Sequence, residues 1–104
     1  MRVIVNNQEI KLIIANSFFK KLKGFMFEQE INYCLRLKTN NVHTFFMKKN
    51  LDIVLTDKNN KVLYVFKNVK KNKIIIKPKA YFTYEFPSGF IKNLKIGKKL
   101  NIIN

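Results

Sequence analysis

The sequence has few of the residues on which small catalytic motifs depend. It contains one cysteine, Cys34, so neither an internal disulfide nor a CxxC metal or redox site can form. Its three glycines, at positions 24, 89 and 97, are too far apart for a phosphate-binding glycine-rich loop, which disfavours nucleotide-dependent chemistry. Because there is one histidine and no metal-ligand spacing, we expect no metal and no cofactor.

Long apolar runs are also missing. No stretch approaches the roughly 20 consecutive apolar residues of a membrane-spanning helix, so we expect no membrane span. The first residues lack the apolar core of a secretory signal peptide. These two features predict a cytoplasmic protein.

Acidic residues are scarce, which leaves the chain strongly basic. Six acidic and 21 basic side chains give a formal net charge of +15, which is typical of proteins that bind nucleic acid or another polyanion. Only Arg2 and Arg36 carry the guanidinium fork that base and phosphate recognition favours. Lys, Asn and Ile supply 46 of the 104 residues, and their codons are A/T-rich, so genome base composition is an alternative explanation.

Alanine is rare, while β-branched and aromatic residues are abundant, which favours strands over long helices. The length predicts a single domain over residues 1–104. The expected fold is α+β and mostly β, a small curled sheet or barrel-like domain of seven to eight short strands with one or two short helices. Helical patterns occur between Ser17 and Gly24 and at residues 90–95. Strand patterns occur at residues 2–5, 9–15, 33–38, 43–47, 51–56, 61–66, 74–76, 81–86 and 100–103.

Some of these segments also carry expectations about exposure and turns. The alternation of apolar and polar residues over 33–38 predicts that the Cys34 side chain points outward and is half exposed. Residues 61–66 are apolar on both faces after the first position, which predicts a central strand covered on both sides. Asparagine-rich turns are expected at residues 6–8 and 57–60.

Several short motifs follow one another along the chain from the first helical pattern onward: Gly24-Phe25-Met26-Phe27, Cys34-Leu35, His43-Thr44-Phe45-Phe46-Met47, Leu51-Asp52-Ile53-Val54-Leu55, Asp57-Lys58-Asn59-Asn60, Tyr84-Glu85-Phe86-Pro87-Ser88-Gly89 and Ile96-Gly97-Lys98-Lys99-Leu100. In this order they resemble the domain of unknown function 192 family, a group of uncharacterised conserved proteins. The chain departs from the family pattern at Asn50, where a proline often precedes the Leu-Asp pair, and at Lys98, which replaces the usual aspartate. The resemblance implies a compact, β-rich α+β domain and no established reaction.

Two acids stand inside apolar strand patterns, which makes them the most informative polar residues. Burial of an unpaired carboxylate is costly, so Asp52 and Glu85 each need water, a cation or several hydrogen-bond donors. In a structural interpretation, Asp52 accepts hydrogen bonds from nearby backbone amides or from Lys48 and Lys49, and Glu85 forms a salt bridge with a lysine or an arginine. In a functional interpretation, both acids face a ligand cleft. Both interpretations remain open.

A non-catalytic module that binds an unknown small ligand or protein is the function that the sequence favours. Its candidate ligand-binding residues are the two acids inside strand patterns and two residues that share a face if residues 43–47 form a strand: His43, Met47, Asp52 and Glu85. A hydrolase that uses Asp52 and Glu85 as an acid/base pair is an alternative, so the sequence does not decide whether the protein is an enzyme. No residue is assigned a catalytic role.

A polyanion binder is the other alternative. It would hold nucleic acid through lysine clusters, which must then converge on one face of the molecule. The candidate nucleic-acid-binding residues are Lys48, Lys49, Lys70, Lys71 and Lys73, with a further pair at Lys98-Lys99.

Overall fold

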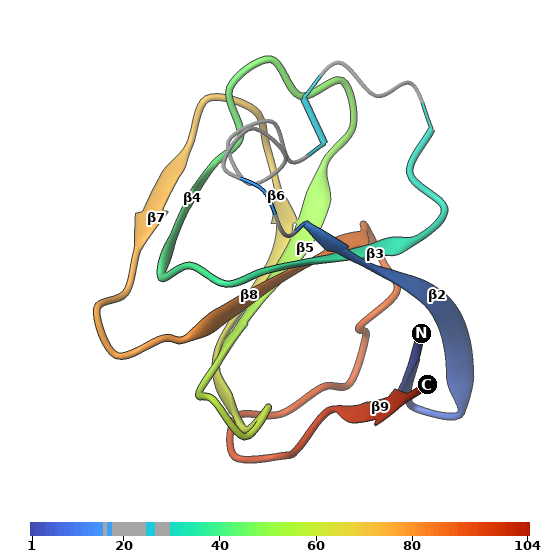
Figure 1. Ribbon diagram of the computed structural model, residues 1–104. Coiled ribbons are helices and arrows are strands. Elements are labelled where there is room, and N and C mark those ends of the chain that lie inside the picture. Colours follow the sequence, from blue (N-terminus) through green and yellow to red (C-terminus); the bar gives the residue numbers. More distant parts are fainter. Residues whose placement is uncertain (16, 18–24, 27–29) are drawn as a thin grey trace.

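The computed structural model of the protein describes residues 1–15, 17, 25–26 and 30–104, which form two β-sheets (Figure 1). The larger sheet contains β1 (Arg2–Val5), β2 (Gln8–Ala15), β3 (Cys34–Leu37), β5 (Leu51–Thr56), β6 (Val62–Val69), β8 (Phe82–Pro87) and β9 (Asn101–Ile103). The smaller sheet contains β4 (Asn41–His43) and β7 (Ile74–Ile76). The prediction of a mostly β domain with a curled sheet is confirmed.

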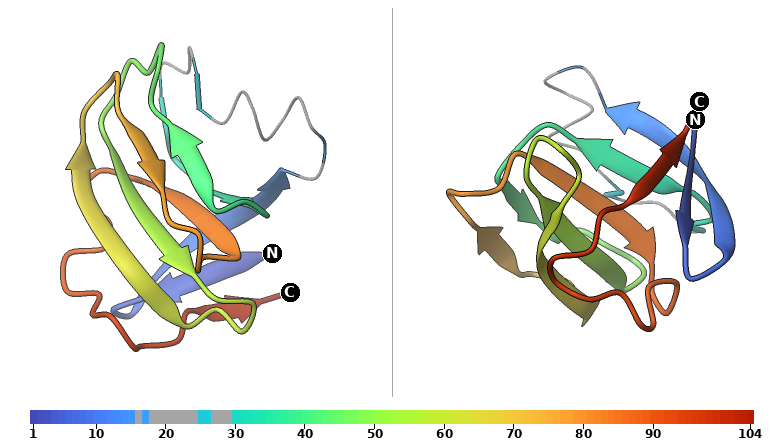
Figure 2. Two further views of the ribbon diagram at one scale, coloured as in Figure 1. Left: turned by 90° about the vertical axis from the view of Figure 1, so that its left-hand side faces the viewer. Right: turned by 90° about the horizontal axis from the view of Figure 1, so that it is seen from below.

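The larger sheet curls into a half-barrel (Figures 1 and 2). Its strand order is β6-β5-β8-β3-β2-β1-β9, and all neighbours are antiparallel except β2 and β3, which run parallel. Strand β1 pairs with β9, so residues near the two ends of the chain lie side by side.

Both faces of the larger sheet are covered by apolar clusters. One cluster includes Val3, Leu12, Cys34, Val54, Tyr84, Phe86, Ile91 and Leu100. The other includes Phe25, Leu35, Leu37, Val42, Met47, Leu51, Ile53 and Leu55, with Ile75 packed against it. Strand β5 is buried along its whole length, because its successive side chains alternate between these two clusters. The β4–β7 pair covers the second cluster through Val42 and Ile75.

The predicted asparagine-rich turns are present. Asn6 and Asn7, between β1 and β2, have φ angles of 52° and 65°, the left-handed conformation that asparagine tolerates better than most residues. In the turn between β5 and β6, the Asp57 carboxylate accepts hydrogen bonds from the amides of Asn59 and Lys61, and Asn60 has a φ of 65°.

Helices were expected at two places, and no helix occurs in the described residues. The first predicted helix falls on residues 17–24, of which only residue 17 is described. The second prediction, a helical turn over residues 90–95, is not confirmed as a helix, because this segment forms isolated hydrogen-bonded turns. The amide of Phe90 bonds to the carbonyl of Pro87, and the amide of Leu94 to that of Ile91, at 3.2 Å each.

The prediction of a strand over residues 43–47 is also wrong. Strand β4 ends at His43, and the chain then turns, with the Met47 amide donating to the Thr44 carbonyl at 3.3 Å. Phe46 has a φ of 62°, which is outside the β region and ends the alternation on which the prediction depended.

The prediction that residues 61–66 form a central strand is wrong, since β6 ends the larger sheet. The Lys77 ammonium lies 5.0 Å from the Tyr64 ring centre and 5.7 Å from that of Phe66, so a cation covers these aromatic residues. At the start of β6, the Val62 amide donates to the Lys98 carbonyl at 2.8 Å.

Cys34 was expected to be half exposed, but it is fully buried in the first cluster. Strand β3 lies between β2 and β8 in a sheet covered on both faces, so three of its four residues are buried and only Arg36 is partly exposed. Burial raises the pKa of the Cys34 thiol well above its usual value, with a further contribution from Glu85. A thiol in these surroundings is a poor nucleophile.

We therefore expect Cys34 to be unreactive in the folded protein. With Ellman's reagent at pH 8, the native chain should react at least about a hundredfold more slowly than the same chain in denaturing urea, because attack requires an accessible thiolate. Complete labelling after denaturation is the control for an intact thiol. Native labelling as fast as that of the unfolded chain would contradict the burial of this side chain.

Candidate functional site

Thr44 connects two loops that are distant in sequence. Its side chain is 1% exposed, and its hydroxyl donates to the Lys70 carbonyl at 2.7 Å and accepts from the Lys73 amide at 2.8 Å. Its backbone amide donates to the Lys73 carbonyl, and its carbonyl accepts from the Asn72 amide. These bonds hold the loop after β6 against the turn after β4.

The turn after β4 directs adjacent side chains in different directions. The positive φ of Phe46 lets Met47 enter the second apolar cluster, where it is 6% exposed, while Lys48 remains exposed. The φ of Asn72 is 65°, which similarly turns the loop after β6 back toward Thr44. Both loops therefore have a defined path that their sequence motifs alone do not indicate.

The two loops line an open cationic hollow of about 580 Å³, which we call the lysine hollow. In Figures 1 and 2 they lie together at the upper end of the molecule. Among the residues that the structure describes, the lining has three lysines, one amide, one thioether and no carboxylate: Met47, Lys48, Asn50, Lys70 and Lys71. Such a lining attracts anions, because each unpaired ammonium group adds to the local positive potential.

A second hollow of about 340 Å³ adjoins the first, because Asn50 lines both. Its other lining residues include Lys49, Ser88 and Glu30, so this hollow has mixed charge. Lys49 therefore lies beside the lysine hollow and not within its lining.

Asp52 is buried inside the fold and is connected to the lysine hollow through Asn68 and Asn50. It is 2% exposed, and its carboxylate accepts hydrogen bonds from the backbone amides of Asn68 at 2.8 Å, Gly89 at 2.8 Å and Ile91 at 3.4 Å. The Asn68 side chain in turn accepts from the Asn50 amide group at 2.9 Å. Asp52 thus connects β5, the end of β6 and the turn after β8, and it holds Asn50 at the rim.

Glu85 is buried without a hydrogen-bond partner at one of its oxygens. It is 3% exposed, and Oε1 has no partner. Burial raises the pKa of Glu85 to about 8, so the carboxyl group is mostly protonated at neutral pH. The basic partner that sequence reasoning offered for Glu85 is not present in the described residues.

The two acids lie on opposite faces of the larger sheet. In the β5–β8 ladder, Asp52 is opposite Phe86 and Ile53 is opposite Glu85. Opposite residues share a face, and adjacent residues do not. Asp52 therefore faces the first cluster with Phe86, while Glu85 faces the second cluster with Ile53. The structure does not bring the two carboxylates into one cleft.

His43 lies apart from both acids, on β4. Its Nδ1 accepts a hydrogen bond from the Phe45 amide at 3.2 Å, and the two rings stack with centres 5.3 Å apart. Val42, the residue before it, faces the core, so His43 is on the outer face of the β4–β7 pair. None of the hollows described here is lined by His43, Asp52 or Glu85.

The structure thus gathers parts of two predicted residue sets. Met47 from the ligand-binding set joins Lys48, Lys70 and Lys71 from the polyanion set, whereas Lys73 contributes its backbone amide to Thr44. Sequence reasoning missed Thr44 and Asn50, whose roles depend on partners 18 to 29 residues away. Among the described residues, no three His, Cys, Asp or Glu side chains are grouped as metal ligands would be.

The curled half-barrel and the motif order agree with a single family. The chain belongs to the DUF192 family, described as "Uncharacterized ACR", whose sequence pattern matches residues 1–102. The resemblance inferred from the motifs is therefore confirmed, and the family carries no established activity.

Two relatives with curated names share this family relationship. The chain is 33% identical over 89 residues to UPF0127 protein PH1112 of Pyrococcus horikoshii, covering 79% of this chain and 76% of that protein. It is 29% identical over 98 residues to a UPF0127 protein of Thermococcus sibiricus, covering 85% of this chain. The matched part spans 63% of that second relative's length.

Two solved structures have the same fold. A protein of unknown function from Novosphingobium aromaticivorans matches with a TM-score of 0.82 over 97% of this chain and 82% of that one. A protein from Sinorhizobium meliloti, named a "putative transcription regulator", matches with a TM-score of 0.82 over 96% of this chain and 89% of that one. Both are 15% identical to this chain, so the likeness concerns the fold alone. In the described part of the chain, no helix is long and apolar enough to cross a membrane.

Proposed function

We propose that this protein is a non-catalytic module that binds an anionic ligand in the lysine hollow. The observation that carries the proposal is the convergence of Lys48, Lys70 and Lys71 on one hollow, whose lining contains no carboxylate from the described residues. A ligand with two or more negative charges would neutralise several of these ammonium groups at once. The Thr44 hydrogen bonds keep the two loops in place before a ligand arrives, which reduces the entropic cost of binding.

A binding role is favoured over hydrolysis by the state of the two acids. Asp52 has its carboxylate occupied by backbone amides, and Glu85 is enclosed in an apolar cluster on the other face of the sheet. A general acid/base pair needs both groups within reach of one substrate bond. This geometry supports no such pair.

Calorimetric titration with inorganic pyrophosphate tests the proposal. The double variant Lys70→Ala/Lys71→Ala should weaken binding at least about tenfold, since each lost charge-assisted hydrogen bond is worth about 1.5–3 kcal/mol. The matched control is Lys58→Ala/Lys79→Ala, which removes the same charge from exposed sites outside the hollow. Equal affinity in the two double variants would overturn the proposal, because net charge alone would then govern binding.

A nucleic-acid ligand is a second candidate, supported by the same lysines and by the name of the Sinorhizobium meliloti neighbour. The Lys98-Lys99 pair, however, lies at the opposite end of the molecule from the lysine hollow (Figures 1 and 2). If single-stranded DNA contacts only the lysine hollow, about three phosphates are neutralised, and log affinity should fall with log salt at a slope near −2. A much steeper slope would indicate that the DNA also contacts lysines outside the lysine hollow.

A further inference from the structure

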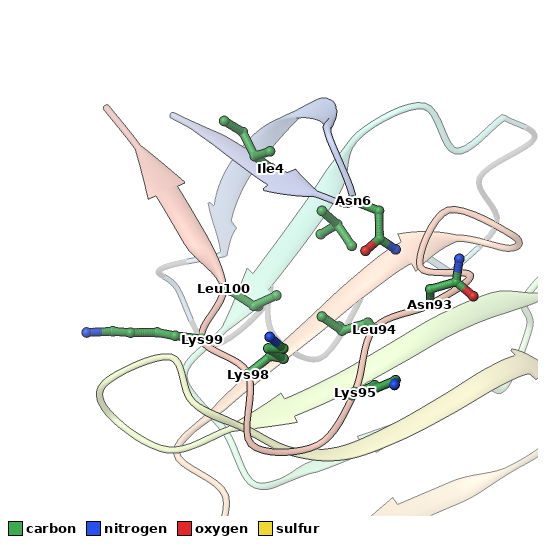
Figure 3. A pocket seen from close by; sticks show the side chains of 9 residues that line it. Ile4, Asn6, Asn93, Leu94, Lys95, Lys98, Lys99 and Leu100 are labelled. Carbon is green, nitrogen blue, oxygen red and sulfur yellow. The ribbon is translucent and has the colours of Figure 1, made fainter.

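A third hollow, of about 330 Å³, lies at the other end of the molecule from the lysine hollow. It is formed by the turn between β1 and β2 and by the segment that precedes β9. Figure 3 shows that the Asn6 and Asn93 amide groups lie at one end of it and Lys98 and Leu100 at the other, with Leu94 between. We call it the amide hollow.

The backbone around the amide hollow is fixed by hydrogen bonds to the start of β6. The Gly97 amide donates to the Val62 carbonyl, the Val62 amide to the Lys98 carbonyl, and the Leu100 amide to the Asn60 carbonyl, at 2.8 to 2.9 Å. Gly97 has a φ of 93°, a conformation open to glycine, which allows this tight path. The hollow is therefore a preformed feature of the fold.

Charge in the amide hollow comes mainly from Lys95 and Lys98. Lys99 extends away from the other labelled side chains in Figure 3. Its charge acts instead on Asp57, whose pKa is lowered first by the Lys61 backbone amide and in smaller part by the Lys61 and Lys99 charges. No carboxylate from the described part of the chain lines the hollow.

The nearest acid in the β1–β2 ladder is already paired. Glu9 stands opposite Ile4, which lines the hollow, but its carboxylate lies 3.2 Å from the Arg2 guanidinium. Glu9 is therefore engaged by Arg2, and the hollow keeps its positive charge.

The floor of the amide hollow is apolar. Val5 and Leu100 belong to the first apolar cluster and are 2% and 4% exposed, so the apolar surface open to a ligand comes from the half-buried Ile4 and Leu94. A dry cavity of roughly 150 Å³ holds a benzene-sized molecule, so about 330 Å³ gives room for one ring or branched aliphatic group and a charged head.

We propose that the amide hollow binds a small anion with an apolar body, a phosphate or carboxylate carried on an aromatic or branched aliphatic group. The apolar body contacts Ile4 and Leu94, the charged head contacts Lys95 and Lys98, and the Asn6 and Asn93 amides orient polar atoms of the ligand. This site goes beyond the lysine hollow, from which it differs in location and in its apolar floor.

Titration of the ¹⁵N-labelled protein with phenyl phosphate, inorganic phosphate and phenol, followed by amide chemical shifts, tests the proposal. Phenyl phosphate should give saturable shifts at Asn6, Asn93, Leu94, Lys98 and Leu100. Its affinity there should be at least about tenfold higher than that of inorganic phosphate or phenol, because only phenyl phosphate uses both the floor and the charges.

Variants separate this site from general attraction to a basic surface. Lys98→Ala and Asn93→Ala should each weaken phenyl phosphate at least about fivefold, while Lys99→Ala, the neighbouring lysine that points away, should not. Asn6 is left unchanged, since its φ of 52° makes alanine unfavourable there. Thermal melts of each variant check that the fold is retained.

Two results would overturn the proposal. One is equal affinity for phenyl phosphate and inorganic phosphate, which would exclude use of the apolar floor. The other is a set of shifts at Lys70 and Lys71 and none at Asn93 or Lys98, which would support the lysine hollow and exclude this one. Lys70→Ala/Lys71→Ala should leave the phenyl phosphate shifts at the amide hollow intact. The amide-hollow proposal can therefore fail or hold independently of the proposal for the lysine hollow.

Discussion

Asp52→Ala should destabilise the fold by about 3 kcal/mol or more, because it leaves three backbone amides without their acceptor. The amides of Asn68, Gly89 and Ile91 all donate to this carboxylate inside the protein. Each buried donor left unsatisfied costs about 1–3 kcal/mol, although water entering the vacated space would offset part of this loss. Urea denaturation at pH 7 measures the difference in unfolding free energy.

Asp57→Ala is the matched control for this prediction. Asp57 also accepts two backbone hydrogen bonds, from Asn59 and Lys61, but these are exposed to solvent. Water can replace an exposed acceptor, so the loss should stay near 1 kcal/mol, as for other exposed caps. Equal losses in the two variants would mean that the buried position of Asp52 has no special role in holding β5, β6 and the turn after β8.

The strands and turns of this fold could be predicted largely from local pattern. Alternation and β-branched residues indicated β1, β2, β3, β5 and β8 within one or two residues of their observed limits. Asparagine at the turn positions was equally informative, since Asn6, Asn7 and Asn60 adopt positive φ angles there. These signals succeed because each depends only on residues close in sequence.

Exposure was predicted less well, because it depends on what covers each face. The alternation around Cys34 is real, but both faces of β3 are packed, and so the residue expected at the surface is fully buried. For strand β6 the prediction failed in the opposite direction, because a strand expected at the centre of the sheet lies at its edge. An edge strand can be apolar on both sides when a side chain such as Lys77 covers its aromatic rings. Neither outcome is encoded in the strand itself.

The candidate site was predicted as a set of residue types and not as an arrangement. The lysines of residues 48–49 and 70–73 were recognisable as clusters, but their convergence depends on Thr44, whose hydroxyl reaches 26 and 29 residues along the chain. Asp52 and Glu85 were rightly singled out as acids inside strands, and only the β5–β8 register separates them onto two faces. A one-residue change of register would have put them on the same face.

Wild-type stability should fall as pH rises from about 4.5 to about 8, and Glu85→Gln should remove most of that fall. The folded-state pKa of Glu85 is about 8, raised by burial from the ordinary value of 4.5. Between these values the folded chain binds a proton that the unfolded chain has released, so the unfolding free energy decreases with pH. A shift of this size corresponds to roughly 5 kcal/mol, which is fully present below pH 4.5 and lost once pH passes 8.

Urea denaturation at pH 5, 6, 7 and 8.5 measures this slope in wild type, in Glu85→Gln and in the control Glu9→Gln. Glutamine keeps the shape of the protonated acid and cannot ionise, so at pH 8.5 the Glu85 variant should be the more stable protein by several kcal/mol. Glu9 is exposed and paired with Arg2, so its variant should keep the wild-type slope. The range stops at pH 8.5 because the Cys34 thiol, whose own pKa is raised, would add a second fall at higher pH. A wild-type slope that persists in Glu85→Gln would assign the pH dependence to another group and show that water or a basic side chain reaches the Glu85 carboxylate.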